Sequence, residues 1–375
     1  MSSGPTIGVL VNPIAGMGGR VGLKGTDGPD ILARARVLGA VPVAGLRAQI
    51  TLKELAAKIQ GLQVKSPPGD MGESVVREVG LEPEIVGTSR YKSTTSEDTI
   101  RLARQLADEG VDLLLFAGGD GTARDMVSAI GGNQPVLGIP AGVKIHSAVY
   151  AKTPLSAAAL AKRFLNGGGR NCQDAEVLDI DENNYRQGRL NTRLYGYLKI
   201  PADRRLTQGL KAGSPASDRS DQQGIAEAVA ADFDREYSYI IGPGSTTNAI
   251  LNYLGLPATL LGVDLLHSQQ IVECDLNESE LLESTAGKNV KIIVTPIGGQ
   301  GFIFGRGNQQ ISPAILRQVG KDNLMVIATK RKILDLKGRS LLIDTGDTEL
   351  DHQMAGYYKI ITSYNDRIVY KVECG

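Results

Sequence analysis

A run of apolar residues that leads directly into a glycine-rich loop constrains this chain more than any other feature. Val111–Ala117 is nearly all apolar, and residues 118–122 (GGDGT) follow it at once. A strand with so few polar positions is typical of a parallel sheet that helices cover on both faces. Residues 123–130 have the pattern of a helix, so the segment predicts a buried strand, a tight loop and a helix.

The rest of the N-terminal part alternates strands with helices. Strand-like runs lie at 6–11, 83–87 and 135–139, and helix-like runs lie at 31–39, 99–110 and 156–165. Thr95-x-x-Asp98 resembles a capping box ahead of the second of these helices, with aspartate in place of the usual Glu or Gln. Because alternating strands and helices are joined by right-handed crossovers, we expect an open, mostly parallel α/β sheet through about residue 150.

The length of the chain predicts two domains. With 375 residues, 42% hydrophobic side chains and 46 glycines, the chain is too long for one ordinary core. Asn166-Gly167-Gly168-Gly169 is the best candidate boundary, because three glycines do not hold a regular element. We therefore expect an α/β domain over 1–165 and a β-rich domain over 170–330. Residues 331–375 are expected to pack back on the N-terminal domain.

The composition argues against several classes of partner. Lys plus Arg (41) equals Asp plus Glu (41), tryptophan is absent and aromatics make up 5% of the chain, so we expect no nucleic-acid partner. The N-terminal residues have no signal-peptide pattern and no apolar run is long enough to cross a bilayer, which predicts a cytoplasmic protein without a membrane partner. Three widely spaced cysteines predict reduced thiols.

The GGDGT loop has the properties of a phosphate-binding site. The glycines, Gly118, Gly119 and Gly121, let backbone amides approach an anion, and the start of the following helix adds partial positive charge. Asp120 is the exception, because a carboxylate beside phosphates is unfavourable unless it accepts a proton or helps to hold a metal. A role at an acceptor hydroxyl would explain it. The alternative is an ordinary turn in which Asp120 caps the helix.

Further glycine-rich segments could share this site. Asn12 ends the first strand and is followed by a loop with Gly16 and Gly18, and the carboxyl ends of parallel strands meet along one edge. Lys144 and His146 follow the strand at 135–139. No P-loop, dinucleotide fingerprint or serine-hydrolase elbow is present in the sequence.

Two clusters in the second half also suit a nucleotide. GPGSTTN at 242–248 offers small hydroxyls and free amides, although Ser245 or Thr246 could simply cap a helix. In the glycine-rich segment 298–310, Arg306 could clamp a phosphate, and a tight hairpin explains the same residues equally well.

Taken together, these motifs resemble the ATP-NAD kinase superfamily in its AcoX-like branch. The resemblance rests on Asn12-Pro13, GGDGT, the turn at 138–142, GPGSTTN, and GGQGFIFGRGNQQISP at 298–313. It implies an α/β N-terminal domain, a β-rich C-terminal domain that contributes to the acceptor site, and NAD lying between them. The implied reaction is 2′-phosphorylation of NAD(H) by ATP or polyphosphate, with Mg²⁺ brought in by the nucleotide, in a homo-oligomer.

The resemblance also assigns residues. Asp120 matches the acidic residue that activates the ribose hydroxyl, and Glu176 matches the glutamate of an Asn-Glu pair. We expect phosphate or nucleotide contacts from Asn12, Gly16, Gly18, Gly118, Gly119, Gly121, Thr122, Lys144 and Arg306. We expect contacts with NAD or another acceptor from Gly142, His146, Glu176, Gly244, Ser245, Thr246 and Thr247.

Two departures from the family pattern concern the acceptor. Ala175 stands where the family has asparagine, and the tyrosine that usually follows Gly-Ser-Thr-Ala is missing near Asn248. These changes remove a hydrogen-bond donor and a stacking ring. Kinases for another small alcohol or a lipid, and a nucleotide-sensing protein without catalysis, therefore remain as alternatives.

Overall fold

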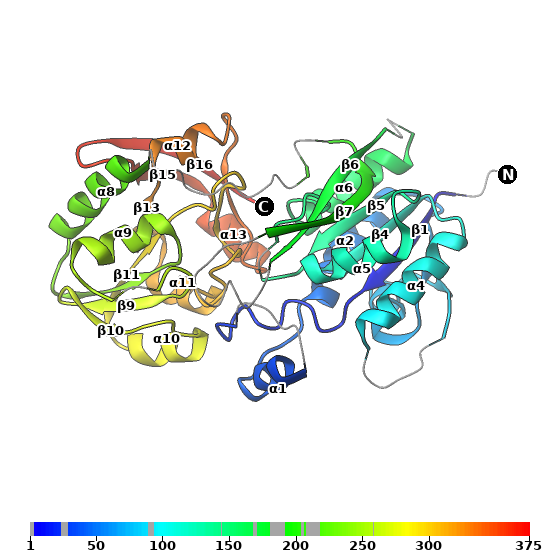
Figure 1. The fold of residues 1–375 in the computed structure, drawn as a ribbon, viewed down its shortest axis with the longest axis horizontal. Helices are drawn as coiled ribbons and strands as arrows, with labels where there is room; N and C mark the ends of the chain where they lie inside the picture. Colours follow the sequence, from blue (N-terminus) through cyan, green and yellow to red (C-terminus); the bar gives the residue numbers. More distant parts are fainter. Residues whose placement is uncertain are drawn as a thin grey trace. The chain divides into compact units, whose positions relative to one another are not determined.

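The computed structural model describes residues 4–23, 29–88, 94–143, 145–167, 171–180, 192–203, 206–207, 218–257 and 259–375 (Figure 1). Contacts between residues divide the chain into two compact units. Unit 1 comprises Met1–Met17 and Gly25–Leu210, and unit 2 comprises Gly18–Lys24 and Lys211–Gly375.

Unit 1 is built on a five-stranded sheet in which every strand pair is parallel, in the order β3-β2-β1-β4-β5. Ile7 pairs with Leu113 and Val11 with Ala117, which fixes the register of the two central strands. The strands are β1 (Thr6–Val11), β2 (Gln63–Ser66), β3 (Pro83–Ile85), β4 (Leu113–Gly118) and β5 (Val136–Pro140). All six residues of β4 are buried, as expected for a strand covered on both faces.

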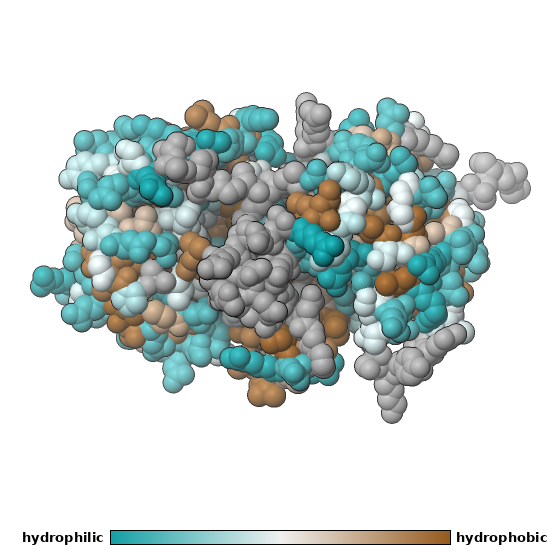
Figure 2. Space-filling model, viewed as in Figure 1, coloured by the Kyte–Doolittle hydropathy of each residue, from teal (hydrophilic) through white to brown (hydrophobic). Residues whose placement is uncertain are grey.

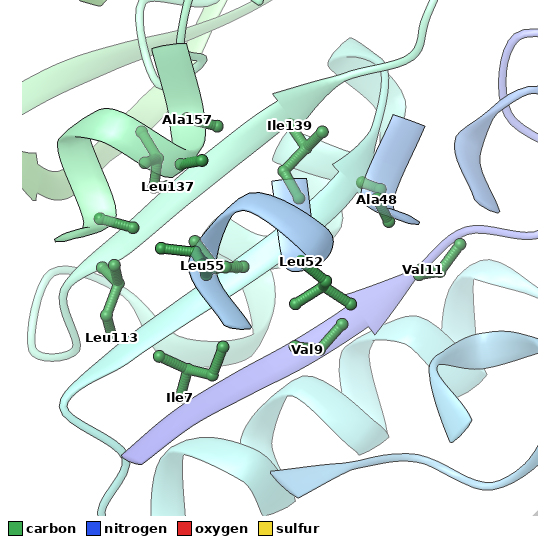
Figure 3. Packing of buried hydrophobic residues seen from close by; sticks show 14 of the residues in the cluster. Ile7, Val9, Val11, Ala48, Leu52, Leu55, Leu113, Leu137, Ile139 and Ala157 are labelled. Atoms are coloured by element: carbon green, nitrogen blue, oxygen red, sulfur yellow. The ribbon is translucent and has the colours of Figure 1, made fainter. Parts of the chain in front are cut away.

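Helices cover both faces of this sheet. On one face, alternate side chains of β1, β4 and β5 pack against Leu52 and Leu55 of α2 and Ala157 of α6 (Figure 3). The other face packs against α4 and α5 through residues such as Phe116 and Met126. The helices are α1 (Pro29–Val37), α2 (Ala44–Lys58), α3 (Glu73–Glu78), α4 (Ser96–Asp108), α5 (Asp120–Ile130) and α6 (Pro154–Leu165). The prediction of an open, parallel α/β sheet is confirmed.

The start of α4 follows from its sequence. The Thr95 hydroxyl accepts a hydrogen bond from the Asp98 amide, and the Asp98 carboxylate accepts one from the Thr95 amide, 3.1 Å away. These two bonds satisfy amides that the first helical turn leaves without partners. The predicted capping box is therefore present, with aspartate in the third position.

A two-stranded ribbon of β6 (Cys172–Ile180) and β7 (Thr192–Pro201) belongs to unit 1. Ala175, Val177, Leu198 and Ile200 are all buried in the same core as α4 and α5. The two units therefore divide after Leu210, and not at the glycines of 166–169, because this ribbon buries its apolar face against the first sheet.

Unit 2 is centred on a nine-stranded mixed sheet in the order β10-β9-β8-β11-β13-β15-β16-β14-β12. Its strands are β8 (Tyr237–Ile241), β9 (Asp264–His267), β10 (Gln270–Glu273), β11 (Asn289–Val294), β12 (Phe302–Phe304), β13 (Leu324–Ile327), β14 (Leu341–Ile343), β15 (Gly356–Ile361) and β16 (Arg367–Cys374). The predicted β-rich second domain is present. The segment 331–375 supplies β14, β15 and β16 to this sheet, and its predicted packing on the N-terminal domain stays a prediction.

Helices also cover the sheet of unit 2. Ile225 and Val229 of α8 and Ile250 of α9 pack on one face, and Leu281, Ile315 and Leu350 belong to the core on the other. The helices are α8 (Arg219–Ala231), α9 (Ser245–Tyr253), α10 (Glu278–Thr285), α11 (Pro313–Val319), α12 (Lys330–Leu334) and α13 (Thr348–Met354).

On the face seen in Figure 2, polar side chains are interspersed with apolar patches. One patch lies at the end of α1 and before α2, where Val37 is 87% exposed and Val41 is 68% exposed. No helix among the described residues is both long and apolar enough to span a bilayer.

Candidate active site

The carboxyl ends of β1, β4 and β5 meet at one edge of the first sheet, because the three strands are parallel neighbours. Asn12 follows β1, and its amide donates a hydrogen bond to Ala117 O at 3.0 Å. Its side-chain nitrogen Nδ2 donates to Thr122 Oγ1 at 2.9 Å, across 110 residues of sequence. The structure thus brings together two residues that the sequence assigned to phosphate binding.

The GGDGT loop is shorter than expected. Strand β4 ends at Gly118, Gly119 is the N-cap residue in an extended conformation, and α5 begins at Asp120. A Cβ at Gly118 would lie 2.3 Å from Thr122 Oγ1, so any larger residue would displace the loop. Because the first amides of α5 have no partners within the helix, they and the helix dipole favour an anion at this point.

Three loops pack closely around Gly119. Gly118 O accepts hydrogen bonds from the amides of Ala141 (2.9 Å) and Gly142 (3.1 Å), which hold the turn after β5 against the GGDGT loop. Gly16 has φ +83°, and a Cβ there would lie 2.3 Å from Ala141 O. Gly16, Gly119 and Gly142 therefore lie together at the sheet edge. Gly18 belongs to unit 2.

Replacing Gly142 by alanine should displace the phosphate loop. The added Cβ would lie 2.7 Å from Gly119 Cα, and backbone cannot move away as a flexible side chain can. For the phosphoryl transfer that the resemblance implies, we expect the KM for the donor to rise by about 10-fold or more, since misplaced positioning groups cost catalysis at this scale. Steady-state kinetics will measure it. Gly132→Ala is the matched control, because a Cβ there meets nothing within 4 Å; equal kinetics in the two variants would contradict this role.

Both carboxylate oxygens of Asp120 accept hydrogen bonds from backbone amides. The amide of His146 donates to Asp120 Oδ2 at 2.7 Å, and the amide of Ser147 donates to Oδ1 at 3.0 Å. The residue is 7% exposed. An ionised carboxylate offers about four acceptor positions, so further hydrogen bonds to Asp120 remain possible. The two amides fix its orientation and leave it able to accept a proton from a third group.

Burial raises the pKa of Asp120 from 3.8 to about 7. The hydrogen bonds from Ser147 and from the His146 amide oppose this effect, while the negative charge of Asp179 adds to it. A base is most effective when its pKa lies near the working pH, because it is then both unprotonated and basic enough. Asp120 therefore has the pKa of a general base that works near neutral pH.

The helix that Asp120 starts also contacts β6. One turn later, Arg124 forms an ion pair with Asp179 of β6 at 3.0 Å, and its guanidinium lies 5.6 Å from the ring centre of Tyr195 on β7. The ribbon is thus joined to α5 by charge as well as by apolar packing. None of these three residues was singled out from the sequence.

His146 belongs to the segment that holds Asp120, and Glu176 is bonded to the residue that follows this segment. His146 is 3% exposed and contributes its amide, as described above. The Glu176 carbonyl accepts a hydrogen bond from the Ala148 amide at 2.9 Å, and its side chain is half-buried. Two of the seven residues predicted to contact the acceptor, His146 and Glu176, are therefore linked to Asp120 by backbone hydrogen bonds of residues 146–148. Lys144 lies outside the described residues.

GPGSTTN forms the start of α9 in unit 2. Gly244 is the N-cap residue with φ +139°, and Ser245 is the first helical residue. The hydroxyls of Thr246 and Thr247 differ in their partners. Thr247 Oγ1 donates to Gly244 O at 2.9 Å, whereas Thr246 Oγ1 is buried and has no hydrogen-bond partner among the described residues. A buried hydroxyl of this kind often marks a place where water or a ligand binds.

Arg306 has a structural position inside unit 2. It is 4% exposed, and its guanidinium pairs with Asp344 Oδ2 at 3.2 Å and lies 5.0 Å from the ring centre of Phe302. Packing leaves room only for glycine at the adjacent position, Gly305, since a Cβ there would lie 1.7 Å from Asp344 O. Of the two readings of the sequence, this arrangement favours a tight turn over a phosphate clamp, and the clamp stays a prediction.

Sequence reasoning missed two residues that support the loop. The Tyr150 hydroxyl donates to Gly119 O at 2.5 Å, and its buried ring occupies the space where a Cβ of Gly138 would lie. Ser147 holds Asp120 and is completely buried. A polar residue a few positions after a glycine-rich turn was the available signal, but it does not reveal its partner.

Two family models match this chain. The ATP-NAD kinase N-terminal domain matches residues 7–169, and the ATP-NAD kinase C-terminal domain matches residues 235–372. No individual curated protein matches the chain. The two matches lie in the family's order and cover the GGDGT loop in the first and the GPGSTTN and GGQG segments in the second. The protein is therefore a kinase by family, and it belongs to the ATP-NAD kinase superfamily.

Proposed function

We propose that the protein transfers a phosphoryl group from ATP or polyphosphate to the 2′-hydroxyl of NAD(H). The observation that carries the proposal is Asp120, the first residue of a helix that follows a glycine-rich loop, with both oxygens held by amides. A carboxylate at a phosphate site, with a pKa of about 7, fits a base that accepts the proton of a hydroxyl nucleophile.

In this mechanism Asp120 orients the acceptor hydroxyl and takes its proton. The hydroxyl oxygen attacks the terminal phosphorus of the donor, the bond from that phosphorus to the bridging oxygen breaks, and the proton ends on the Asp120 carboxylate. The transition state of such transfers is loose, so most of the catalysis comes from positioning and from compensation of charge. The amides of His146 and Ser147 serve positioning, because they fix the carboxylate before the substrate arrives.

The donor phosphates are assigned to the sheet edge around Gly119. The free amides at the start of α5 and the close approach of Gly16 and Gly142 suit a phosphate chain. Within the described ranges, no group of three His, Cys, Asp or Glu residues could hold a metal ion. Magnesium commonly binds through nucleotide phosphates with few protein ligands, so we propose that Mg²⁺ enters with ATP and neutralises its charge.

Within unit 1, we propose Glu176 as a contact of NAD; the contacts predicted for Ser245, Thr246 and Thr247 of unit 2 stay predictions. Ala175, where the family has asparagine, is 4% exposed and packs in the core of unit 1. A side-chain amide at this position would be buried among apolar residues, which is costly without hydrogen bonds. Glu176 is the next residue of β6 and points to the opposite face, so it is the better candidate for contact with substrate. The homo-oligomeric state and the cytoplasmic location stay predictions.

One observation favours a lipid acceptor as the second candidate. Val37, Val41 and Leu46 are 87%, 68% and 58% exposed, and Val43 between them donates its amide to Ala15 O beside Gly16. An exposed apolar patch beside a phosphate loop would suit an enzyme that works at a membrane surface. The match to both ATP-NAD kinase domains makes NAD the first candidate.

An acceptor panel separates these candidates. The protein is incubated with Mg²⁺ and ATP labelled in the γ-phosphate, and with NAD, NADH, acetoin-like small alcohols or vesicles that contain diacylglycerol. Label in NAD or NADH supports the proposal. Label only in a small alcohol or the lipid assigns the same chemistry to another acceptor. Saturable NAD binding without transfer from ATP or polyphosphate would identify a nucleotide sensor and overturn the kinase assignment.

The rate should depend on pH through Asp120. Because the base acts only when ionised, and its pKa is about 7, kcat should fall as the pH drops from 8 to 6. Below pH 7 the loss should approach about 10-fold per pH unit. A profile of kcat from pH 5 to 9 at saturating substrates measures this. A rate that stays constant between pH 5 and 7 would show that Asp120 does not act as the base.

A further inference from the structure

Ser147 is completely buried, and both its amide and its hydroxyl form hydrogen bonds. Its amide donates to Asp120 Oδ1 at 3.0 Å. Its hydroxyl donates to Leu178 O at 2.8 Å and accepts a hydrogen bond from the Leu178 amide at 3.0 Å. A single side chain therefore satisfies both backbone groups of one residue of β6.

The neighbouring contacts strengthen this connection. The amide of Ala148 donates to Glu176 O, so residues 147 and 148 are fastened to two alternate positions of β6. On the other side, His146 and Ser147 hold the two oxygens of Asp120. The segment 146–148 thus lies between the catalytic carboxylate and the strand that carries Glu176.

We propose that Ser147 is a positioning residue that orients the Asp120 carboxylate, and that it does so by fastening the segment 146–148 to strand β6. The inference rests on the proposed role of Asp120 as the base. If a ligand that binds Glu176 shifts β6, the same contacts would change the orientation of the Asp120 carboxylate. Recognition of the acceptor and orientation of the base are thereby coupled.

The Ser147 hydroxyl has one proton and two acceptors within reach. It donates this proton to Leu178 O in the structure, and its interaction with the Asp120 carboxylate lowers the pKa of Asp120. Among the described residues, the charged or titratable groups on the elements that contact Asp120 include Arg124 on its own helix, His146 on the segment, and Glu176 and Asp179 on β6. Loss of the hydroxyl removes a group that favours the ionised carboxylate and leaves these charges in place.

Ser147→Ala tests the proposal. We expect kcat at pH 7 to fall by about 10-fold, and the acid limb of the kcat profile to move up by about one pH unit, as for the loss of a hydrogen bond to a charged group. The KM for the donor should not change, because the phosphate loop keeps its contacts. In the Asp120→Asn background, the same substitution should have no further effect on the residual rate. Ser128→Ala is the control, since Ser128 lies on the same helix as Asp120 and its exposed hydroxyl donates to Arg124 O.

A measurement on the protein without substrates separates this inference from the proposed function. The carboxyl carbon of Asp120, assigned by its absence in Asp120→Asn, is titrated by ¹³C NMR in wild type and in Ser147→Ala. A higher pKa in the variant supports the inference even if no acceptor is ever phosphorylated. If the wild type makes NADP but neither the acid limb nor this titration moves, Ser147 is merely structural and the inference is wrong.

If Ser147→Ala does not fold, Ser147→Cys replaces it, because a thiol keeps the size and forms only weak hydrogen bonds; the same two outcomes then decide.

Discussion

Asp120→Asn should lower the turnover of phosphoryl transfer by ~10²–10⁴-fold while the protein stays folded. Asparagine keeps the shape of the side chain but cannot accept the proton of the acceptor hydroxyl. Steady-state kinetics at pH 8, where the wild-type carboxyl is ionised, will measure the loss. Circular dichroism will show whether the fold is kept. A folded Asp120→Asn variant with full activity would contradict the role assigned to this residue.

The same variant should differ from wild type in how its stability depends on pH. The pKa of the Asp120 carboxyl is about 7 in the folded protein against an ordinary value of 3.8, so between these values the folded state binds more protons than the unfolded state. The wild type therefore loses stability as the pH rises through this window, whereas asparagine does not titrate. The difference in melting temperature between Asp120→Asn and wild type should move in favour of the variant between pH 5 and pH 8.

Arg306→Met should lower the stability of unit 2 by about 3–5 kcal/mol, because it removes the positive charge that is paired with the buried Asp344 carboxylate. Both side chains of the pair are nearly inaccessible, at 3% and 8% exposure. The expected change is a fall of roughly 10 °C in the melting temperature. The KM for ATP, measured well below that temperature, should not change if Arg306 is structural. A stable Arg306→Met variant with a raised KM for ATP would instead identify Arg306 as a phosphate clamp.

Two companion variants define the scale of this effect. Arg331→Met removes one partner of an exposed pair with Asp335, at 53% and 41% exposure, and should cost at most about 1 kcal/mol. Arg306→Met combined with Asp344→Leu removes both buried charges and should recover much of the lost stability. Equal destabilisation by Arg306→Met and Arg331→Met would contradict the buried ion pair.

Local sequence patterns predicted β4, the start of α4 and the edge at which β1 and β4 end. The apolar run before GGDGT could only be a strand covered on both faces, and the capping box at Thr95 fixed the start of α4 to within a few residues. The ends of β1 and β4 were predicted to meet at one edge, and the structure places Asn12 of the first beside Thr122 after the second. The helix after GGDGT begins three residues earlier than expected, at Asp120, since glycines and an aspartate conceal the first turn of a helix.

Other features depended on contacts that no local pattern reveals. The ribbon of β6 and β7 joins unit 1 because its alternate apolar residues meet those of α5 and Arg124 pairs with Asp179, whereas three glycines at 167–169 gave a stronger local signal for a boundary. Helix α2 was missed, although Leu52 and Leu55 are central to the core, because its polar residues obscure the apolar stripe. Arg306 and Asp344 are 38 residues apart, so their ion pair could not be anticipated.

The most direct test of the central claim is the formation of NADP. The protein is incubated with NAD, Mg²⁺ and either ATP or polyphosphate, and NADP is detected with an NADP-specific dehydrogenase. The proposed chemistry predicts NADP with at least one donor, at a rate that falls by ~10²–10⁴-fold in Asp120→Asn and remains unchanged in Gly132→Ala. No NADP with either donor, under conditions in which the protein is folded and binds NAD, would contradict the proposed reaction.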